Sequence, residues 1–324
     1  MLRRFLILII VFISFLGSSA FAQVQNSDIT LSISPSNPKA NQNIEAKVTS
    51  YILDTKGSYF TWKVNEETKS TGIGKSTFSF TLGSLNSQTN LSVNITTTDG
   101  KTLTQSMTLY GADIDMLWEA VDSYAPPFYR GKTLFAKEGE VKVVAIPSVY
   151  SENKKVSPNT LSYIWEKDGN GQQGASGFGK NFFVYKNSFL DNSNEVQVSV
   201  SDINKQVNTT GKINISPYTP KILFYKKDVS GIKTEKVIGN DYFIKPEGEN
   251  IFVAPYFFSP KNLNSQDLEI KWFVNGKQIL SSVFKNELYV TPEKEQTGSA
   301  NIKVIINNLQ TLYQSLEKGI NVNF

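Results

Sequence analysis

Any chemistry in this chain has to work without histidine and cysteine, because the sequence contains neither. Their absence excludes Ser-His-Asp and Cys-His catalysis, disulfides, and zinc sites built from imidazole or thiolate. A pair of carboxylates could still hydrolyse a glycoside. The acidic residues, however, follow predicted strands or lie on their polar faces, as Glu66 and Glu67 do, which is typical of a solvated surface. We therefore expect no catalytic residues, no cofactor and no enzyme activity.

One segment has the spacing of a phosphate-binding loop. Residues 174–180 read Gly-Ala-Ser-Gly-Phe-Gly-Lys, but Asn181 follows where Ser or Thr would hold magnesium. A predicted strand comes next, so no helix N-terminus would face a phosphate. Residues 72–75 repeat the pattern as Gly-Ile-Gly-Lys. This recurrence favours a structural turn whose glycines adopt positive φ or allow a close backbone approach.

Calcium needs only oxygen ligands, and two places offer them. Residues 168–172, Asp-Gly-Asn-Gly-Gln, lack the spaced carboxylates and distal Glu of an EF-hand loop. Asp113 and Asp115 are two residues of one face at the start of a predicted strand. We expect an ordinary turn and an ordinary junction, hence no metal site, with calcium as the lesser alternative.

One short segment has the composition of a contact site. It combines three aromatic side chains, a rigid Pro-Pro pair and a cation, as protein interfaces and sugar-binding platforms do. Because proline cannot donate to a sheet ladder, we expect the segment in a loop or at an edge, near a junction between domains. Its rings would then contact a ligand or partner, or pack on the neighbouring domain. The candidate residues are Tyr124, Pro126, Pro127, Phe128, Tyr129 and Arg130.

Three tryptophans mark an internal repeat. Trp62, Trp165 and Trp272 end similar short phrases and lie 103 and 107 residues apart, which is the length of one β-sandwich domain. An alternating apolar and polar run begins 29 to 31 residues after each of them, followed by a turn and a second such run. An immunoglobulin-type sandwich has about 100 residues and commonly buries one Trp on its third strand. We therefore expect all three tryptophans in structural cores.

The predicted fold class is all-β, with three tandem immunoglobulin-like β-sandwich domains after an N-terminal signal peptide. The domain boundaries are 23–111, 112–217 and 218–324, separated by short linkers that favour a semi-rigid array. Residues 309–316 are the best helical candidate, but their position in the repeat favours a strand.

The first 22 residues have the pattern of a secretory signal. Arg3 and Arg4 precede an apolar run over residues 5–16, and Ala20-Phe21-Ala22 fits a cleavage site before Gln23. The alternative is an uncleaved anchor, but twelve apolar residues fall short of the roughly 20 that a spanning helix needs. We expect no membrane span in the mature chain.

The charge balance argues against a nucleic-acid partner. The sequence has 33 basic and 29 acidic residues, and without Arg3 and Arg4 the balance is 31 to 29. A nucleic-acid-binding protein would show a basic stripe, and the sequence has none.

Two stretches resemble a known class of domain. Residues 33–48 resemble the opening strands of bacterial extracellular immunoglobulin-like and PKD-like domains, and residues 163–169, Tyr-Ile-Trp-Glu-Lys-Asp-Gly, resemble their central Trp strand and turn. The PKD turn usually has Gly-Asp-Gly, whereas only the second repeat here has even Asp168-Gly169. Such domains are mostly non-catalytic modules of secreted and surface proteins.

The resemblance implies an exported protein, periplasmic, secreted or at the cell surface, that serves as a spacer, scaffold or adhesin. Its partner would be a protein or glycan at the cell envelope. The alternative is a carbohydrate-binding protein that uses the aromatic segment of the second domain.

Overall fold

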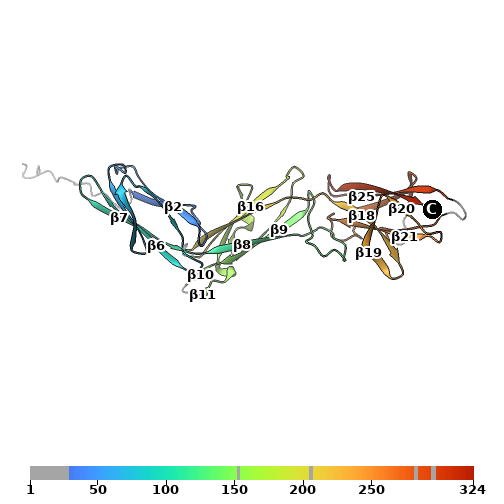
Figure 1. The fold of residues 1–324 in the computed structure, drawn as a ribbon, viewed down its shortest axis with the longest axis horizontal. Helices are drawn as coiled ribbons and strands as arrows, with labels where there is room; N and C mark the ends of the chain where they lie inside the picture. Colours follow the sequence, from blue (N-terminus) through green and yellow to red (C-terminus); the bar gives the residue numbers. More distant parts are fainter. Residues whose placement is uncertain (1–28, 152–153, 204–206, 281–283, 293–296) are drawn as a thin grey trace, which may run out of the picture. The chain divides into compact units, whose positions relative to one another are not determined.

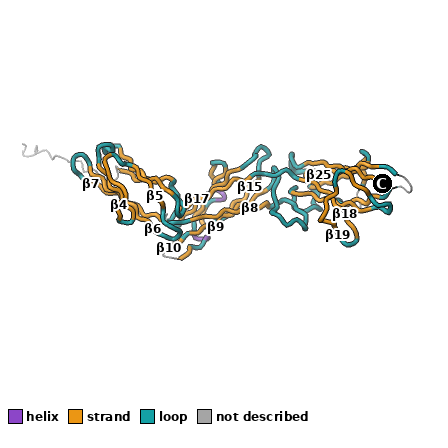
Figure 2. Tube along the Cα trace, viewed as in Figure 1, coloured by secondary structure: helices purple, strands orange, loops and turns teal. Residues whose placement is uncertain are grey.

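The computed structural model describes residues 29–151, 154–203, 207–280, 284–292 and 297–324. The predicted signal peptide, residues 1–22, lies outside the described residues. Strands dominate the described chain, and its only helical elements are two short 3-10 turns, η2 (Pro158–Thr160) and η3 (Gln173–Ala175) (Figure 2). The described residues divide into two compact units: 29–36, 43–80 and 89–108 form the first, and 37–42, 81–88 and 109–324 form the second.

The first sandwich has two antiparallel sheets. One has the order β1-β2-β5 and is formed by β1 (Ile29–Ser34), β2 (Asn43–Ser50) and β5 (Thr77–Thr81). The other has the order β4-β3-β6-β7 and is formed by β3 (Tyr59–Val64), β4 (Glu67–Ile73), β6 (Gln88–Thr96) and β7 (Thr102–Tyr110). Buried and exposed residues alternate along β2 and β6, which is the pattern of a sheet with one face on the core.

The second sandwich repeats this arrangement. Its sheet β15-β9-β8 is formed by β8 (Asp113–Ala120), β9 (Glu140–Ser148) and β15 (Phe182–Lys186). Its sheet β13-β12-β16-β17 is formed by β12 (Ser162–Lys167), β13 (Asn170–Gly171), β16 (Asn194–Ser201) and β17 (Asn208–Ile215), and β14 (Gly177–Phe178) also pairs with β12. A separate small ribbon joins β10 (Tyr150–Ser151) to β11 (Lys154–Lys155).

The third sandwich, orange and red in Figure 1, is more elaborate. Its sheet β19-β18-β21-β24 is formed by β18 (Lys221–Asp228), β19 (Gly231–Ile238), β21 (Glu249–Tyr256) and β24 (Glu287–Val290). Its sheet β20-β26-β25-β22-β23 is formed by β20 (Asp241–Phe243), β22 (Leu268–Val274), β23 (Lys277–Ile279), β25 (Ser299–Asn308) and β26 (Ser315–Asn323). Among the described residues, the hairpin β18-β19 and the parallel pairing of β20 with β26 have no counterpart in the first two sandwiches.

The same core arrangement occurs in all three sandwiches. Trp62, Trp165 and Trp272 are 0%, 0% and 1% exposed, on β3, β12 and β22. Each strand pairs with the strand that the alternating pattern predicted, β6, β16 or β25. The all-β fold with three tandem immunoglobulin-like sandwiches is therefore confirmed.

The glycine-rich loops complete this core. The indole N–H of Trp62 donates to the carbonyl of Lys75 at 2.8 Å, and that of Trp165 donates to the carbonyl of Lys180 at 2.9 Å. Trp272 has the same bond, to Lys285 at 2.9 Å. The glycines before the first two lysines have positive φ, as expected, at 147° and 70° for Gly72 and Gly74 and 134° and 68° for Gly177 and Gly179. The segment that mimics a phosphate-binding loop thus presents a carbonyl to a buried tryptophan.

A second repeated contact was not predicted. Three residues after each Trp comes an Asn or Asp with positive φ, namely 49° at Asn65, 50° at Asp168 and 47° at Asn275. Its backbone N–H donates to a carbonyl on the facing strand, and its side-chain oxygen accepts the N–H of that same residue at 2.8 Å. The partners are Asn90, Glu195 and Asn301. We call this contact the Asx clip. It joins the end of the Trp strand to its neighbour.

The expectation of a strand over residues 309–316 is wrong for 309–314. The side chain of Asn308 accepts the N–H of Gln310 at 2.9 Å, which turns the chain at the end of β25, and β26 begins only at Ser315. The loop that results carries Gln314, whose side chain is buried and holds two parts of the second unit together, as described below.

Candidate functional site: the interface between the second and third sandwiches

The aromatic segment lies in the loop that connects β8 to β9. No strand is assigned between Ala120 and Glu140, and the N–H of Tyr129 closes a turn by donating to the carbonyl of Pro126 at 2.8 Å. Pro126 is buried and Pro127 is exposed. This green loop lies beside the third sandwich within the second compact unit (Figure 1).

Backbone hydrogen bonds attach this loop to the third sandwich. Tyr124 donates its N–H to the carbonyl of Phe258 and accepts the N–H of Phe257, both at 2.7 Å. Nearby, the linker residue Tyr218 donates its N–H to the carbonyl of Phe135 at 2.8 Å. The loop is thus paired like a short strand with the segment that follows β21.

The rings of the loop pack on rings of β18 and β21. Phe128 meets Tyr225 edge to face, with ring centroids 5.3 Å apart. Tyr129 meets Tyr256 and Phe257 in the same way, at 5.6 and 5.7 Å. We call these five residues the interface cluster. Such edge-to-face pairs contribute about 0.5–1.5 kcal/mol each beyond the area they bury.

A polar contact holds the opposite side of the interface. Gln314 is fully buried, accepts the N–H of Ser259 at 2.7 Å and donates to the carbonyl of Lys137 at 2.9 Å. Glu138 accepts the backbone N–H groups of Leu312 and Tyr313 at 2.8 and 3.0 Å. Because these bonds are directional and one of their groups is fully buried, they fix one arrangement of the contacting loops.

Burial also changes the acid–base properties of this region. It raises the pKa of the Tyr124 and Tyr256 hydroxyls, and it raises the pKa of the Asp122 carboxyl. The tyrosines therefore stay neutral at physiological pH. The arrangement is suited to holding two sandwiches together, and it presents no activated nucleophile.

The six predicted contact residues thus have different environments. Phe128 and Tyr129 face the third sandwich, Tyr124 is half-buried, and Pro127 and Arg130 are exposed. Contact of these residues with an external partner stays a prediction. Sequence reasoning missed Gln314 and Glu138, since neither carries a local pattern.

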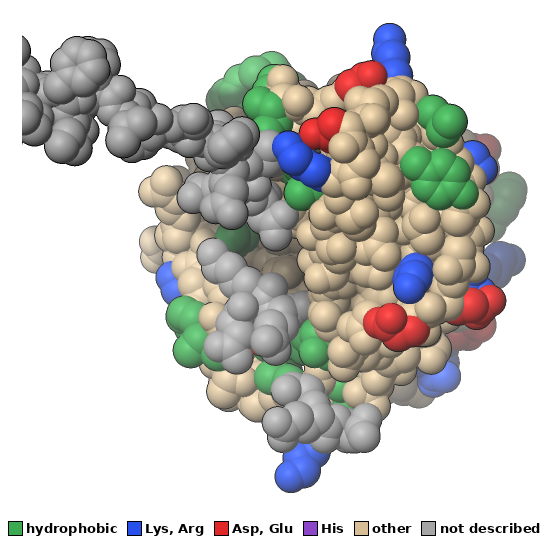
Figure 3. Space-filling view, turned by 90° about the vertical axis from the view of Figure 1, so that its left-hand side faces the viewer, with side chains coloured by type: hydrophobic (Ala, Val, Ile, Leu, Met, Phe, Trp, Pro, Cys, Tyr) green, Lys and Arg blue, Asp and Glu red, His purple; other side chains and the backbone are tan. Residues whose placement is uncertain are grey.

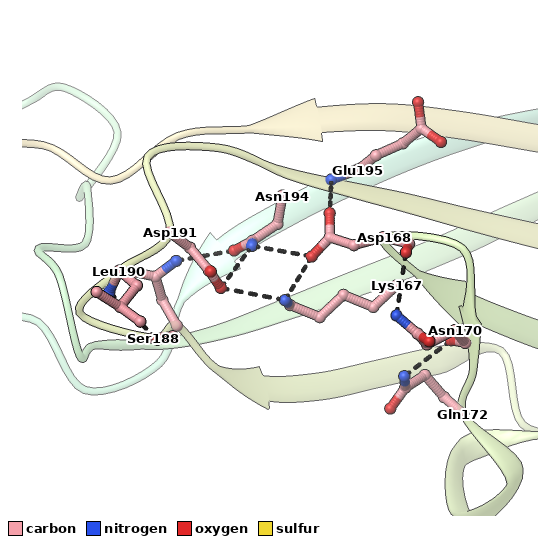
Figure 4. Close-up of polar contacts among 10 residues, drawn as sticks. Lys167, Asp168, Asn170, Gln172, Ser188, Leu190, Asp191, Asn194 and Glu195 are labelled. Carbon is pink, nitrogen blue, oxygen red and sulfur yellow. Dashed lines mark hydrogen bonds and ion pairs between the residues drawn. The ribbon is translucent and has the colours of Figure 1, made fainter.

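The two places considered for calcium have different environments. Both Asp168 and Asp191 accept hydrogen bonds from Lys167, at 2.6 and 3.3 Å, and from Asn194, at 3.2 and 2.9 Å (Figure 4). Asp113 and Asp115 lie exposed on one face of β8. No group of three or more potential metal ligands occurs in the described part of the chain.

The Asx clip of the second sandwich gives a testable difference between two substitutions. Asp168→Asn keeps the clip in the form found at Asn65 and Asn275, so we expect a loss below about 1 kcal/mol in the free energy of unfolding. Asp168→Ala removes the acceptor and places alanine, which disfavours a positive φ, at φ 50°. The free energy of unfolding should fall by about 2–3 kcal/mol. Urea unfolding of the mature chain measures both, and equal losses would contradict the clip.

The pH dependence of this clip has a definite sign. Burial alone would raise the pKa of Asp168, but the hydrogen bonds from Lys167, Glu195 and Asn194 and the charge of Lys167 together outweigh it and hold the pKa below 3.8. The ionised Asp168 carboxylate therefore stabilises the folded state fully above about pH 3.8. This stabilisation is lost as the pH falls through the lowered pKa. Asp168→Asn should remove this part of the acid sensitivity. Chelation with EDTA should leave the melting temperature unchanged, and a shift would favour calcium.

Comparisons with known proteins give only distant similarities. No family model matches the chain, and no curated protein sequence matches it. Similar solved structures include fibronectin(III)-like modules of Clostridium thermocellum CbhA, with 14% identity over 58% of this chain and 93% of that one and a TM-score of 0.29. The central fibronectin-III array of RIM-binding protein has 8% identity, 90% and 95% coverage and a TM-score of 0.30. Immunoglobulin domains 1–5 of Sidekick-1 have 9% identity, 91% and 59% coverage and a TM-score of 0.22. Because these TM-scores are low, the fold assignment depends on the sheets described above.

Proposed function

We propose that the chain is a non-catalytic exported protein of the cell envelope or surface. Its three immunoglobulin-like domains, residues 23–111, 112–217 and 218–324, act as a spacer, scaffold or adhesin. The observation that carries the proposal is the interface between the second and third sandwiches. Interfaces between freely moving domains are small and polar, whereas this one combines the interface cluster with the buried side-chain amide of Gln314.

Several features support export and a partner at the envelope. The predicted signal at residues 1–22 and the lack of cysteine fit an exported, disulfide-free protein. Among the described residues, no helix has the length and apolar character to cross a membrane. On the face drawn in Figure 3, side chains of both charges are interspersed, without the basic stripe that nucleic acid needs. The partner would be a protein or a glycan.

Carbohydrate binding by the aromatic segment of the second domain is less well supported. A sugar platform needs exposed ring faces, whereas Phe128 and Tyr129 pack against Tyr225, Tyr256 and Phe257. The contacts favour a structural role for these rings.

Export gives the direct test of this proposal. When the full chain is expressed in a bacterium, we expect to find it outside the cytoplasm, and we expect its mass to be that of a chain that begins at Gln23. Cell fractionation and intact mass spectrometry measure both. Replacing Arg3 and Arg4 with Glu should reduce export, whereas Arg130→Glu, at an exposed position far from the signal, should not. Full-length chain that stays in the cytoplasm would contradict the proposal.

A further inference from the structure

The third sandwich has an open hollow of about 610 Å³ between β19 and β20. A second hollow, of about 470 Å³, lies beside the loop that precedes β21. Both are lined by Lys226 and Asp228 at the end of β18. The first hollow is formed by the hairpin β18-β19 and the short β20. Volumes of this size fall within the range of small-ligand sites.

Buried charges line these hollows. Glu249 is 6% exposed and is held by Lys226 and by the hydroxyl of Tyr242. The Lys226 side chain is 29% exposed, so its ammonium group is partly open to solvent although the carboxylate it pairs with is buried.

The charges of the two hollows are balanced, which limits the class of ligand. The first is lined by three cations, Lys226, Lys233 and Lys236, and three carboxylates, Asp228, Glu235 and Asp241. The second is lined by Lys226, Lys227 and Lys245, and by Asp228, Glu247 and Glu249. A polyanion needs an excess of cations. Closely spaced donors and acceptors with no net charge suit a ligand with many hydroxyl groups.

Exposed apolar side chains provide surfaces for stacking. Phe243, at the first hollow, is 79% exposed, and Tyr289, at the second, is 58% exposed. An added peptide strand is a poorer fit. The edge strand β19 carries Lys233, Glu235 and Lys236, and its pairing with β18 shifts register, which are the features that prevent strand addition.

We propose that the two hollows of the third sandwich bind a neutral oligosaccharide. Sugar hydroxyls bond to Asp241 and the lining lysines, and Phe243 stacks on the face of a sugar ring. This site goes beyond the proposed scaffold function, and it does not involve the aromatic segment of the second domain.

The test is calorimetry of the mature chain with cello-, xylo-, manno- and chito-oligosaccharides. We expect at least one of them to bind, and we expect Phe243→Ala and Asp241→Ala each to weaken that binding about tenfold or more. Phe178→Ala is the matched control. Phe178 is an exposed ring of the second sandwich, so its replacement should leave oligosaccharide binding unchanged. Since Phe243 is exposed, its replacement should leave the fold intact, as circular dichroism would show.

Three results would overturn this site. They are no binding of any neutral oligosaccharide, binding that Phe243→Ala leaves unchanged, and tighter binding of an anionic oligogalacturonate than of every neutral probe. The export test of the proposed function is independent of all three.

Discussion

Trp272→Ala is expected to lower the free energy of unfolding by about 3–5 kcal/mol. The side chain is 1% exposed, packs near Phe224 with ring centroids 6.2 Å apart, and donates to the carbonyl of Lys285. Alanine leaves a large cavity and an unpaired carbonyl. Because a domain is stable by only about 5–15 kcal/mol, this loss approaches the stability of the third sandwich. Urea unfolding followed by circular dichroism measures it.

Two further variants separate the causes of that loss. Trp272→Phe retains most of the ring but no N–H donor, so it should cost less than Trp272→Ala. Trp118→Ala should also cost less, because Trp118 is only partly buried. A loss below about 1 kcal/mol for Trp272→Ala would contradict its role in the core.

The repeated core was predictable because its signals are local and periodic. The tryptophan spacing and the alternating runs after each Trp predicted equivalent strands in the three repeats. The structure shows that these strands pair, as β3-β6, β12-β16 and β22-β25. The Asx clip was equally available, since an Asn or Asp follows each Trp by three residues. The hairpin β18-β19 was not, because no repeat in the sequence marks it.

The interface was predictable only in part. Pro126 and Pro127 lack the N–H that a ladder requires, and this placed their segment in a loop. Which surface the neighbouring rings contact depends on residues about 100 positions away in sequence, such as Tyr225. The burial of Gln314 depends on Ser259 and Lys137, 55 and 177 residues away, and no local pattern reports such contacts.

Phe128→Ala is expected to loosen the interface while both sandwiches stay folded. The ring contacts Tyr225, and its loss should cost about 1–3 kcal/mol of the contact between the loop and the third sandwich. The N–H of Phe257, which donates to Tyr124, reports this opening directly. Its hydrogen exchange should become about 5- to 150-fold faster, which corresponds to the same energies.

The pattern of exchange across the second unit distinguishes this local opening from general destabilisation. The N–H of Val198, in the middle of β16, should keep its protection, because that strand is held by its own sheet and core. Phe178→Ala, at an exposed ring of the same sandwich, should change neither amide. Faster exchange at Val198 as well would mean that Phe128 supports the second sandwich itself. Unchanged exchange at Phe257 would mean that the backbone pairing at Tyr124 and the contacts of Gln314 hold the interface without the ring.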